Sequence, residues 1–266
     1  MIRRPCVAGR FYPADPYTLK KDVEGFLSDR PKEKAVAIIA PHAGYIYSGA
    51  VAGEVYSSIE IPDDIILIGP NHTGMGKKIS VMSGGVWEVP SGRLKINSAL
   101  AELVLGGSRL FSSDVEAHRA EHSLEVQLPF IHELNKNSSI VPITVMTATA
   151  EECALAGRAV AGAISSYGKE VLIVVSSDMN HYESDKKTRV KDKEAIEAVL
   201  RLDAGGLLAV TSAKDISMCG VLPAAVAIEA ARALGAKEAR LVKYATSGET
   251  SGDLDHVVGY AGIIIR

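Results

Sequence analysis

Three histidines occupy the same kind of position in this sequence, directly after short apolar runs. They are His42, His72 and His181, which follow the runs at 35–40, 64–69 and 171–176. In open α/β sheets, ligands bind beyond the carboxyl ends of the strands, and loops that follow parallel neighbouring strands meet there. One histidine in a loop is ordinarily a surface residue, but the repeated placement predicts a shared site. Three imidazoles at one edge suit a metal ion, or a metal ion with a general base.

Cys219 offers a sulfur donor near the start of an apolar, small-residue segment at 221–235. That segment is typical of a buried helix, and the positive end of its dipole is expected to lower the pKa of the thiol. Cys219 would then be a good metal ligand or nucleophile. Glycines near the candidate ligands allow the backbone to approach a bound group closely: Gly44, Gly74 and Gly220. Cys6 and Cys153 have no such context and are interpreted as structural.

The segment 121–130 brings one more histidine beside two carboxylates. On a helix, His122 and Glu125 would share a face at a spacing of three residues. Imidazoles that bind metals usually donate their second N–H to a carboxylate or a carbonyl, and Glu121 or Glu125 would provide that acceptor. The same residues also fit a solvated first turn before a proline. The remaining histidines are expected at the surface: His118, His132 and His256.

The elements that must position these residues alternate between strands and helices. The runs predicted as strands are 35–40, 64–69, 140–145, 171–176 and 257–265, and the last is expected to close the sheet. Runs that are apolar throughout are typical of strands buried on both faces. Expected helix N-caps are Ser48, Asn97 and Thr149, the last in a capping box with Glu152. The pattern predicts an α/β fold, with a parallel or mixed central sheet between two layers of helices.

Two further segments have a distinct composition. The stretch 184–202 is densely charged and predicts a solvated helix. The polar run 246–253 is rich in glycine, serine and threonine, and predicts a flexible loop that covers the site or connects strands.

The composition limits the classes of function. A chain of 266 residues with this pattern fits a single domain, 1–266. The formal net charge is -3, from 29 basic and 32 acidic residues, so neither nucleic acid nor an anionic membrane is an expected partner. No apolar run reaches the roughly 20 residues that cross a bilayer, and no secretory signal is recognisable. Three widely spaced cysteines favour a reducing cytoplasm.

Six strings together resemble the Memo family, in particular its prokaryotic members called AmmeMemoRadiSam system protein B. They are RRPCVAGRFYP, APHAGYIYSG, GPNHTG, EHSLEVQLPF, SSDMNHY and MCGVLPAAVAIEAA, in this order from about Arg3 to the final strand. The resemblance implies a fold shared with the class III extradiol ring-cleavage dioxygenases. In those enzymes two histidines and a glutamate hold non-haem Fe(II), and another histidine acts as acid and base.

Carried to this sequence, the resemblance implies that His42 and His72 are metal ligands and that Cys219 replaces the carboxylate ligand. His181 corresponds to the acid and base histidine, with Asp178 beside it. Other residues are expected around the pocket: Tyr45, Asn71, Glu121, His122 and Glu125. A thiolate is softer than a carboxylate and favours copper, zinc or thiolate-tolerant iron, so ring cleavage does not follow from the shared fold.

Four functions are compatible with these residues. The first is a metal-dependent redox enzyme that uses iron or copper on a small aromatic or similar substrate. The second is a metal- or peptide-binding module without turnover, like the phosphotyrosine-peptide adaptor role of vertebrate relatives. The third is a zinc-dependent hydrolase in which Asp178 or Glu121 is the base. The fourth is a cysteine nucleophile without a metal. The sequence does not predict an oligomeric state.

Overall fold

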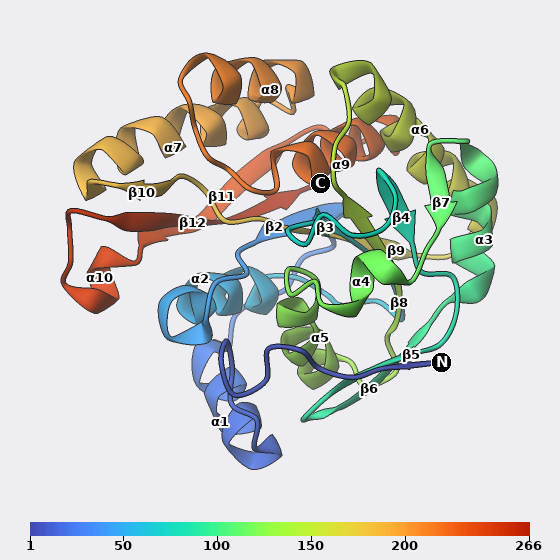
Figure 1. Ribbon diagram of the computed structural model, residues 1–266, viewed down its shortest axis with the longest axis horizontal. Coiled ribbons are helices and arrows are strands. Elements are labelled where there is room, and N and C mark those ends of the chain that lie inside the picture. Colours follow the sequence, from blue (N-terminus) through green and yellow to red (C-terminus); the bar gives the residue numbers. More distant parts are fainter.

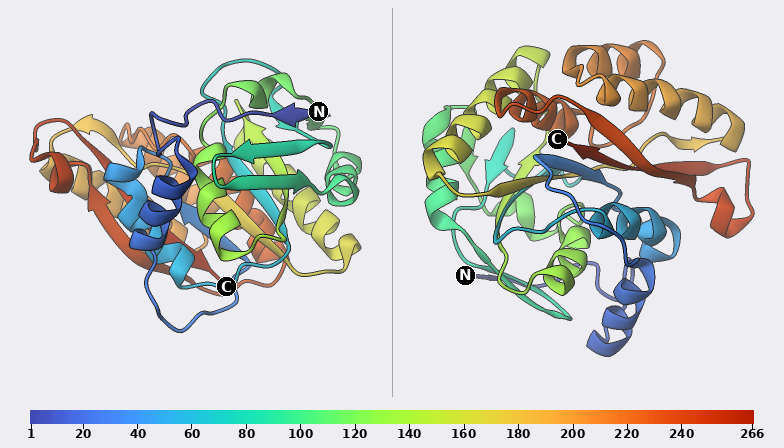
Figure 2. Two further views of the ribbon diagram at one scale, coloured as in Figure 1. Left: turned by 90° about the horizontal axis from the view of Figure 1, so that it is seen from below. Right: turned by 180° about the vertical axis from the view of Figure 1, so that it is seen from behind.

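One mixed sheet of twelve strands forms the centre of the molecule, and helices cover both of its faces (Figure 1 and Figure 2). The computed structural model describes residues 1–266. The strands are β1 (Ile2–Arg3), β2 (Ala37–Ala40), β3 (Asp64–Pro70), β4 (Ile79–Val81), β5 (Val86–Val89), β6 (Gly92–Ile96), β7 (Phe111–Ser113), β8 (Ser139–Val145), β9 (Val171–Ser176), β10 (His181–Glu183), β11 (Ala239–Thr246) and β12 (Val257–Ile265). The α/β prediction with helices on both sheet faces is therefore confirmed.

The helices alternate with these strands along the chain. They are α1 (Pro16–Phe26), α2 (Tyr45–Ser57), α3 (Ser98–Gly107), α4 (Glu116–Arg119), the short 3-10 helix η1 (Glu125–Gln127), α5 (Leu128–Leu134), α6 (Ala150–Tyr167), α7 (Asp185–Leu200), α8 (Ala204–Ala213), α9 (Val221–Ala233) and α10 (Gly248–Ser251). None of them combines the length and the apolar composition that a membrane span requires.

The order of the strands brings the candidate site together. The main path of the sheet is β1-β5-β6-β8-β3-β9-β2-β12-β10. Strands β8, β3, β9 and β2 are parallel neighbours, so their carboxyl ends lie at one edge. Strand β12 runs antiparallel to β2. The run 257–265 is a strand as predicted, but it does not close the sheet, because β11 pairs along its other side.

Two apolar layers hold the helices on the sheet. Alternate residues of the central strands point to opposite faces, so Ile39 and Ile68 enter one cluster of 43 buried residues while Ile38 and Leu67 enter another of 27. The larger cluster includes residues of α3, α6, α7, α8 and α9, and the smaller includes residues of α1, α2 and α5. Burial on both faces explains why these strands are apolar throughout.

Two of the three predicted helix caps are present. Asn97 accepts from the Leu100 N–H, and Thr149 forms the capping box with Glu152. The prediction for Ser48 is wrong, because α2 begins at Tyr45 after Gly44. The Ser48 hydroxyl instead donates to the Ala43 carbonyl at 2.8 Å, inside the first turn.

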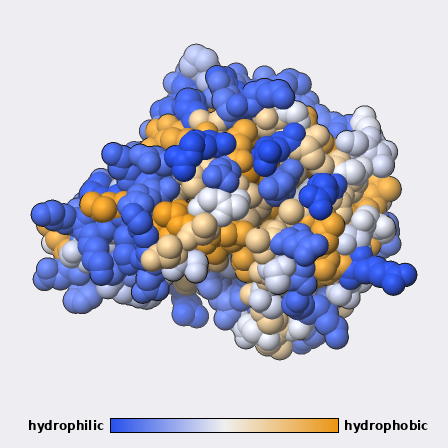
Figure 3. All heavy atoms as spheres, turned by 90° about the horizontal axis from the view of Figure 1, so that it is seen from above, coloured by the Kyte–Doolittle hydropathy of each residue, from blue (hydrophilic) through white to orange (hydrophobic).

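The charged segment predicted as a solvated helix forms α7. On the face shown in Figure 3, the left part, where α7 lies in Figure 1, is mostly hydrophilic, and apolar atoms appear nearer the middle. The polar run 246–253, expected as a loop, contains the short helix α10 and connects β11 to β12. It contributes no residue to the lining of the pocket described below.

Candidate metal site and pocket

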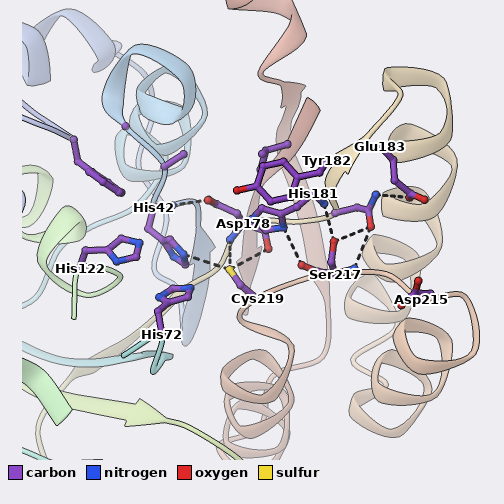
Figure 4. A pocket seen from close by; sticks show the side chains of 15 residues that line it. His42, His72, His122, Asp178, His181, Tyr182, Glu183, Asp215, Ser217 and Cys219 are labelled. Atoms are coloured by element: carbon purple, nitrogen blue, oxygen red, sulfur yellow. Dashed lines mark hydrogen bonds between the residues drawn. The ribbon is translucent and has the colours of Figure 1, made fainter. Parts of the chain in front are cut away.

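A pocket of 740 Å³ lies at the edge where the parallel strands end. His42 follows β2, His72 follows β3, and Asp178 and His181 follow β9, so the expected convergence of three loops is observed (Figure 4). The loop between α8 and α9 and the N-terminal segment complete the lining of the pocket. The lining residues are Phe11, His42, Ala43, Gly44, His72, His122, Asp178, Asn180, His181, Tyr182, Glu183, Asp215, Ser217, Cys219 and Val258.

Three imidazoles form the cluster at one end of this pocket. One ligand nitrogen of each of His42, His72 and His122 lies within 4.8 Å of the other two, so the group could hold a metal ion. The ring centroids of His72 and His122 are 4.6 Å apart and nearly parallel. From the sequence, His122 was expected only as a pocket residue, and the structure places it as the third imidazole of this group.

Glu121, which does not line the pocket, orients His72. The His72 Nδ1 lies 2.8 Å from Glu121 Oε1, and the His72 backbone N–H donates to the same carboxylate. Glu121 is fully buried. Burial alone would raise the pKa of Glu121, but the hydrogen bond and charge of His72 outweigh it and lower the pKa to about 2. In the neutral form of His72, Nδ1–H donates to Glu121 and the other ring nitrogen carries the lone pair that can bind a metal ion.

Ser176 orients His42 in the same way. The Ser176 hydroxyl donates its only hydrogen to the Ser123 carbonyl, so it accepts from His42 Nδ1 at 2.9 Å. His42 Nε2 then carries the lone pair, and it lies 3.3 Å from Cys219 Sγ. Burial lowers the pKa of His42 well below its ordinary value, which keeps the imidazole in the neutral form that binds metals.

Cys219 lines the pocket two residues before α9, but its thiol does not have the expected acidity. Its sulfur accepts from the Asp178 backbone N–H at 3.3 Å. Burial, together with the charge of the Asp178 carboxylate, raises the pKa of the Cys219 thiol. The expected lowering by the α9 dipole is therefore wrong, because the loss of water outweighs the partial charge at the helix end. A bound cation would reverse this balance, since a coordinated thiol is deprotonated.

Asp178 and His181 contribute differently from each other. Asp178 is buried and accepts from the His42 backbone N–H at 2.8 Å, which fixes the turn that carries His42. Burial raises the pKa of Asp178. His181 is partly exposed and lies beside Ser217, toward the other end of the pocket in Figure 4. The histidine cluster and His181 thus belong to two neighbouring parts of one pocket.

Glu125 does not face His122, so the expectation of a shared helix face is wrong. The chain turns at His122, and Glu125 begins η1 with its carboxylate directed to the N-terminal segment. There it forms a buried ion pair with Arg3. It also accepts hydrogen bonds from the backbone N–H groups of Cys6 and Val7 and from the Tyr12 hydroxyl.

The N-terminal segment is a part of the site that the site prediction missed. The ring of Phe11 lines the pocket and lies 4.8 Å from the ring of His122. The Phe11 carbonyl accepts from the Tyr45 N–H at 2.7 Å, at the start of α2. The segment therefore contacts the loops of both His42 and His122. Its sequence, RRPCVAGRFYP, was among the strings that indicated the family, but no motif assigned Phe11 to the pocket.

Several expected residues lie behind the pocket or away from it. Tyr45 is buried and donates to the Val126 carbonyl, and Asn71 accepts from backbone N–H groups in the turn after His72, so neither lines the pocket. His118 was expected at the surface but is fully buried. Of the other two, His132 is half-buried and His256 is exposed.

Comparison with known proteins shows the family of this chain. The family model described as "Memo-like protein" matches residues 3–264. The chain belongs to the Memo family. It is 44% identical to a protein of Pyrobaculum arsenaticum, with 100% of this chain and 99% of that one covered, and 45% identical to a protein of Aquifex aeolicus, with 99% and 98% covered. Both are named "MEMO1 family protein".

A solved structure shows a related fold. The crystal structure of an uncharacterized protein from Escherichia coli K12 superposes with a TM-score of 0.56 at 14% identity. The match covers 87% of this Memo family chain and 100% of the other chain. At this identity the likeness concerns the fold alone.

Proposed function

We propose that this Memo family chain is a metal-dependent oxidoreductase of small molecules, and that His42, His72 and Cys219 hold the ion. The distance between His42 Nε2 and Cys219 Sγ carries the proposal. It is 3.3 Å, and two such donors on one tetrahedral ion lie about 3.5 Å apart when the metal bonds are about 2.0–2.3 Å. The pair is therefore already spaced like two ligands of one ion.

The donor set indicates which ions fit. Two imidazoles and a thiolate suit iron or copper, and zinc is compatible with the same set. Bound there, the ion would supply Lewis-acid or redox chemistry. His122 provides a further imidazole within reach, and Glu121 and Ser176 keep the ligand nitrogens aimed. Proton transfer falls to His181, which lines the same pocket.

The hydrolase alternative has less support from the geometry. Its base would be Glu121 or Asp178. Glu121 already accepts from His72 and from the Ser123 N–H, and Asp178 accepts from the His42 N–H. Glu121 is engaged on both sides and does not line the pocket, which leaves Asp178, a lining residue, as the one candidate base of a hydrolase.

The decisive measurement is the metal content by elemental mass spectrometry, on protein purified without air or chelators. We expect about one iron or copper per chain, lost in both His42→Ala and Cys219→Ser, because each variant removes one of three protein ligands. His256→Ala is the control, since His256 is exposed and outside the pocket.

Stoichiometric zinc would move the assignment to the hydrolase. Protein that contains no metal and takes none up on titration would contradict the proposal. A binding module or a cysteine nucleophile would then remain.

The lining of the pocket favours a small molecule over a phosphotyrosine peptide. None of its 15 residues is lysine or arginine, and three are carboxylates: Asp178, Glu183 and Asp215. Phosphotyrosine recognition depends on arginine clusters that bind the phosphate through two hydrogen bonds at once. A phosphate group would find no such partner among these side chains.

We therefore expect a tyrosine-containing peptide and its phosphorylated form to bind equally weakly. Isothermal titration with both peptides, on the metal-free and metal-loaded chain, measures the difference. If the phosphorylated peptide bound the metal-free chain at least tenfold more tightly than the unphosphorylated peptide, this prediction would be contradicted and the adaptor role supported.

A further inference from the structure

The surroundings of His181 determine which of its nitrogens can take up a proton. We infer that Ser217 and Asn180 hold His181 as the Nδ1–H tautomer and leave Nε2 as the proton acceptor of the pocket. The inference rests on the proposed function for its use, because that function assigns proton transfer to His181. Its physical basis is a set of hydrogen bonds that do not involve the candidate metal ligands.

The first hydrogen bond fixes the tautomer. His181 Nδ1 lies 2.9 Å from the backbone carbonyl oxygen of Ser217. A carbonyl oxygen only accepts, so Nδ1 must carry the hydrogen. In a neutral imidazole the other nitrogen, Nε2, then has the lone pair. His181 Nε2 forms no hydrogen bond within the protein, and the residue lines the pocket.

A second layer of hydrogen bonds holds that carbonyl in place. The His181 backbone N–H donates to the Ser217 hydroxyl at 2.8 Å. The Ser217 N–H and hydroxyl both donate to Asn180 Oδ1, at 3.0 and 3.1 Å. His181 and Ser217 are therefore joined by two direct hydrogen bonds (Figure 4). Asn180 in turn ties Ser217 to the strand end that carries His181.

Asn180 is itself anchored. It is buried, with 1% of its surface exposed. Its backbone N–H donates to Asp192 on α7 at 2.9 Å, and its side-chain amide donates to Glu183 at 2.8 Å. Since both ends of the amide are engaged, Asn180 Oδ1 has one orientation, and the position of Ser217 follows from it.

The backbone next to His181 contains a β-bulge. Strand β10 pairs with β12 at His181 and Glu183 with a register shift between them. The residue in the shift, Tyr182, has a φ of 60°, an uncommon conformation for a bulky side chain. Bulges of this kind re-aim neighbouring side chains. Next to the bulge, His181 contacts Ser217 in the 215–219 loop. Tyr182 itself remains exposed at the pocket.

The tautomer narrows the class of substrate. A neutral His181 can accept a hydrogen bond at Nε2 but cannot donate one, so the group that meets it must be a donor such as a hydroxyl or an amine N–H. When that group transfers its proton, the electron pair stays on the substrate atom and Nε2 gains the hydrogen. The positive charge is then shared with Nδ1–H, which remains bonded to the Ser217 carbonyl.

Nitrogen-15 NMR of the histidine side chains tests this inference in the full chain. The spectrum is recorded without metal, so that the result does not depend on the proposed metal site, and at alkaline pH, above the ordinary histidine pKa of about 6.5. His181→Gln identifies the signals. We expect His181 Nδ1 to show the shift of a protonated nitrogen and Nε2 that of an unprotonated one. The exposed ring of His256 serves as the reference in the same spectrum, with shifts averaged over its two tautomers.

A variant tests what holds the tautomer. Ser217→Ala keeps the carbonyl but removes the hydroxyl bonds to His181 and Asn180. Without them the carbonyl is no longer held against the ring, so we expect the ratio of the two tautomers to move up to about fivefold toward Nε2–H, the change given by losing the ring hydrogen bond of about 1 kcal/mol. Ser212→Ala, in an exposed helical position, should leave the spectrum unchanged.

Two results would overturn the inference. One is a His181 spectrum that matches the averaged pattern of His256 or shows a protonated Nε2. The other is a tautomer ratio that Ser217→Ala does not alter. If the metal analysis failed while the tautomer was observed, the proposed oxidoreductase would be wrong and the assignment of His181 would stand.

Discussion

Replacing Glu125 by alanine is expected to lower the free energy of unfolding by about 3–5 kcal/mol, because a buried arginine loses its counter-charge. Glu125 is fully buried, and the Arg3 side chain is 5% exposed. Burial alone would raise the pKa of Glu125, but Arg3 and the donors around it outweigh that and hold the pKa below its ordinary value. The Cys6, Val7 and Tyr12 donors would lose their acceptor as well.

Urea unfolding at neutral pH measures this loss. Glu102→Ala is the matched control, because Glu102 is an exposed helical glutamate. Its loss should stay within about 0.5 kcal/mol, as for other surface substitutions. A loss for Glu125→Ala no larger than the control would show that the ion pair does not hold the N-terminal segment. The double variant Arg3→Met with Glu125→Leu should recover part of the loss, since it leaves no buried charge alone.

Replacing His118 by leucine is expected to reduce the decrease in the free energy of unfolding as the pH falls. His118 is fully buried, and neither ring nitrogen has a hydrogen-bond partner in the protein. Burial, with the nearby charge of Arg3, lowers its pKa from 6.5 to about 4. Between these values the unfolded chain binds a proton that the folded chain does not, so stability falls as the pH falls. The shift corresponds to about 3 kcal/mol, complete near pH 4.

The measurement is urea unfolding at intervals from pH 7.5 to pH 4. At pH 7.5 His118→Leu should lie within about 1.5 kcal/mol of the natural chain, because leucine has a similar volume. At pH 4 the natural chain should have lost about 3 kcal/mol more than the variant. His256→Leu changes an exposed position and should follow the natural chain. Parallel pH curves for His118→Leu and the natural chain would refute the prediction.

The central strands could be predicted from local sequence, because the same residues are apolar in any arrangement that buries both faces, and so could the starts of α3 and α6. The run 171–176 is β9 residue for residue, and Thr149 with Glu152 forms the expected cap. The candidate site followed from the same logic, since three loops after parallel strands must meet. What sequence spacing lacks is the direction of each side chain, which depends on distant partners.

The wrong assignments share that cause. His118 was expected at the surface because no sequence context distinguished it, yet its side chain packs beside Trp87, with the ring centroids 5.9 Å apart. Glu125 was expected to face His122, but Arg3, 122 residues earlier, draws it the other way. The acidity of Cys219 was inferred from one helix end, whereas burial and Asp178 decide it. In each case a contact across the fold outweighs the local pattern.

The wide separation of the site residues along the chain has a consequence for biosynthesis. His42 and Cys219 are 177 residues apart, and Arg3 meets Glu125 across 122. Contacts between such distant residues form late, because the loop entropy must be overcome first. A growing polypeptide on the ribosome would present its imidazoles long before the cysteine had been made. The apolar clusters on the two sheet faces, not the ion, order the strands that carry the ligands, so metallation would be a late step on an already folded scaffold.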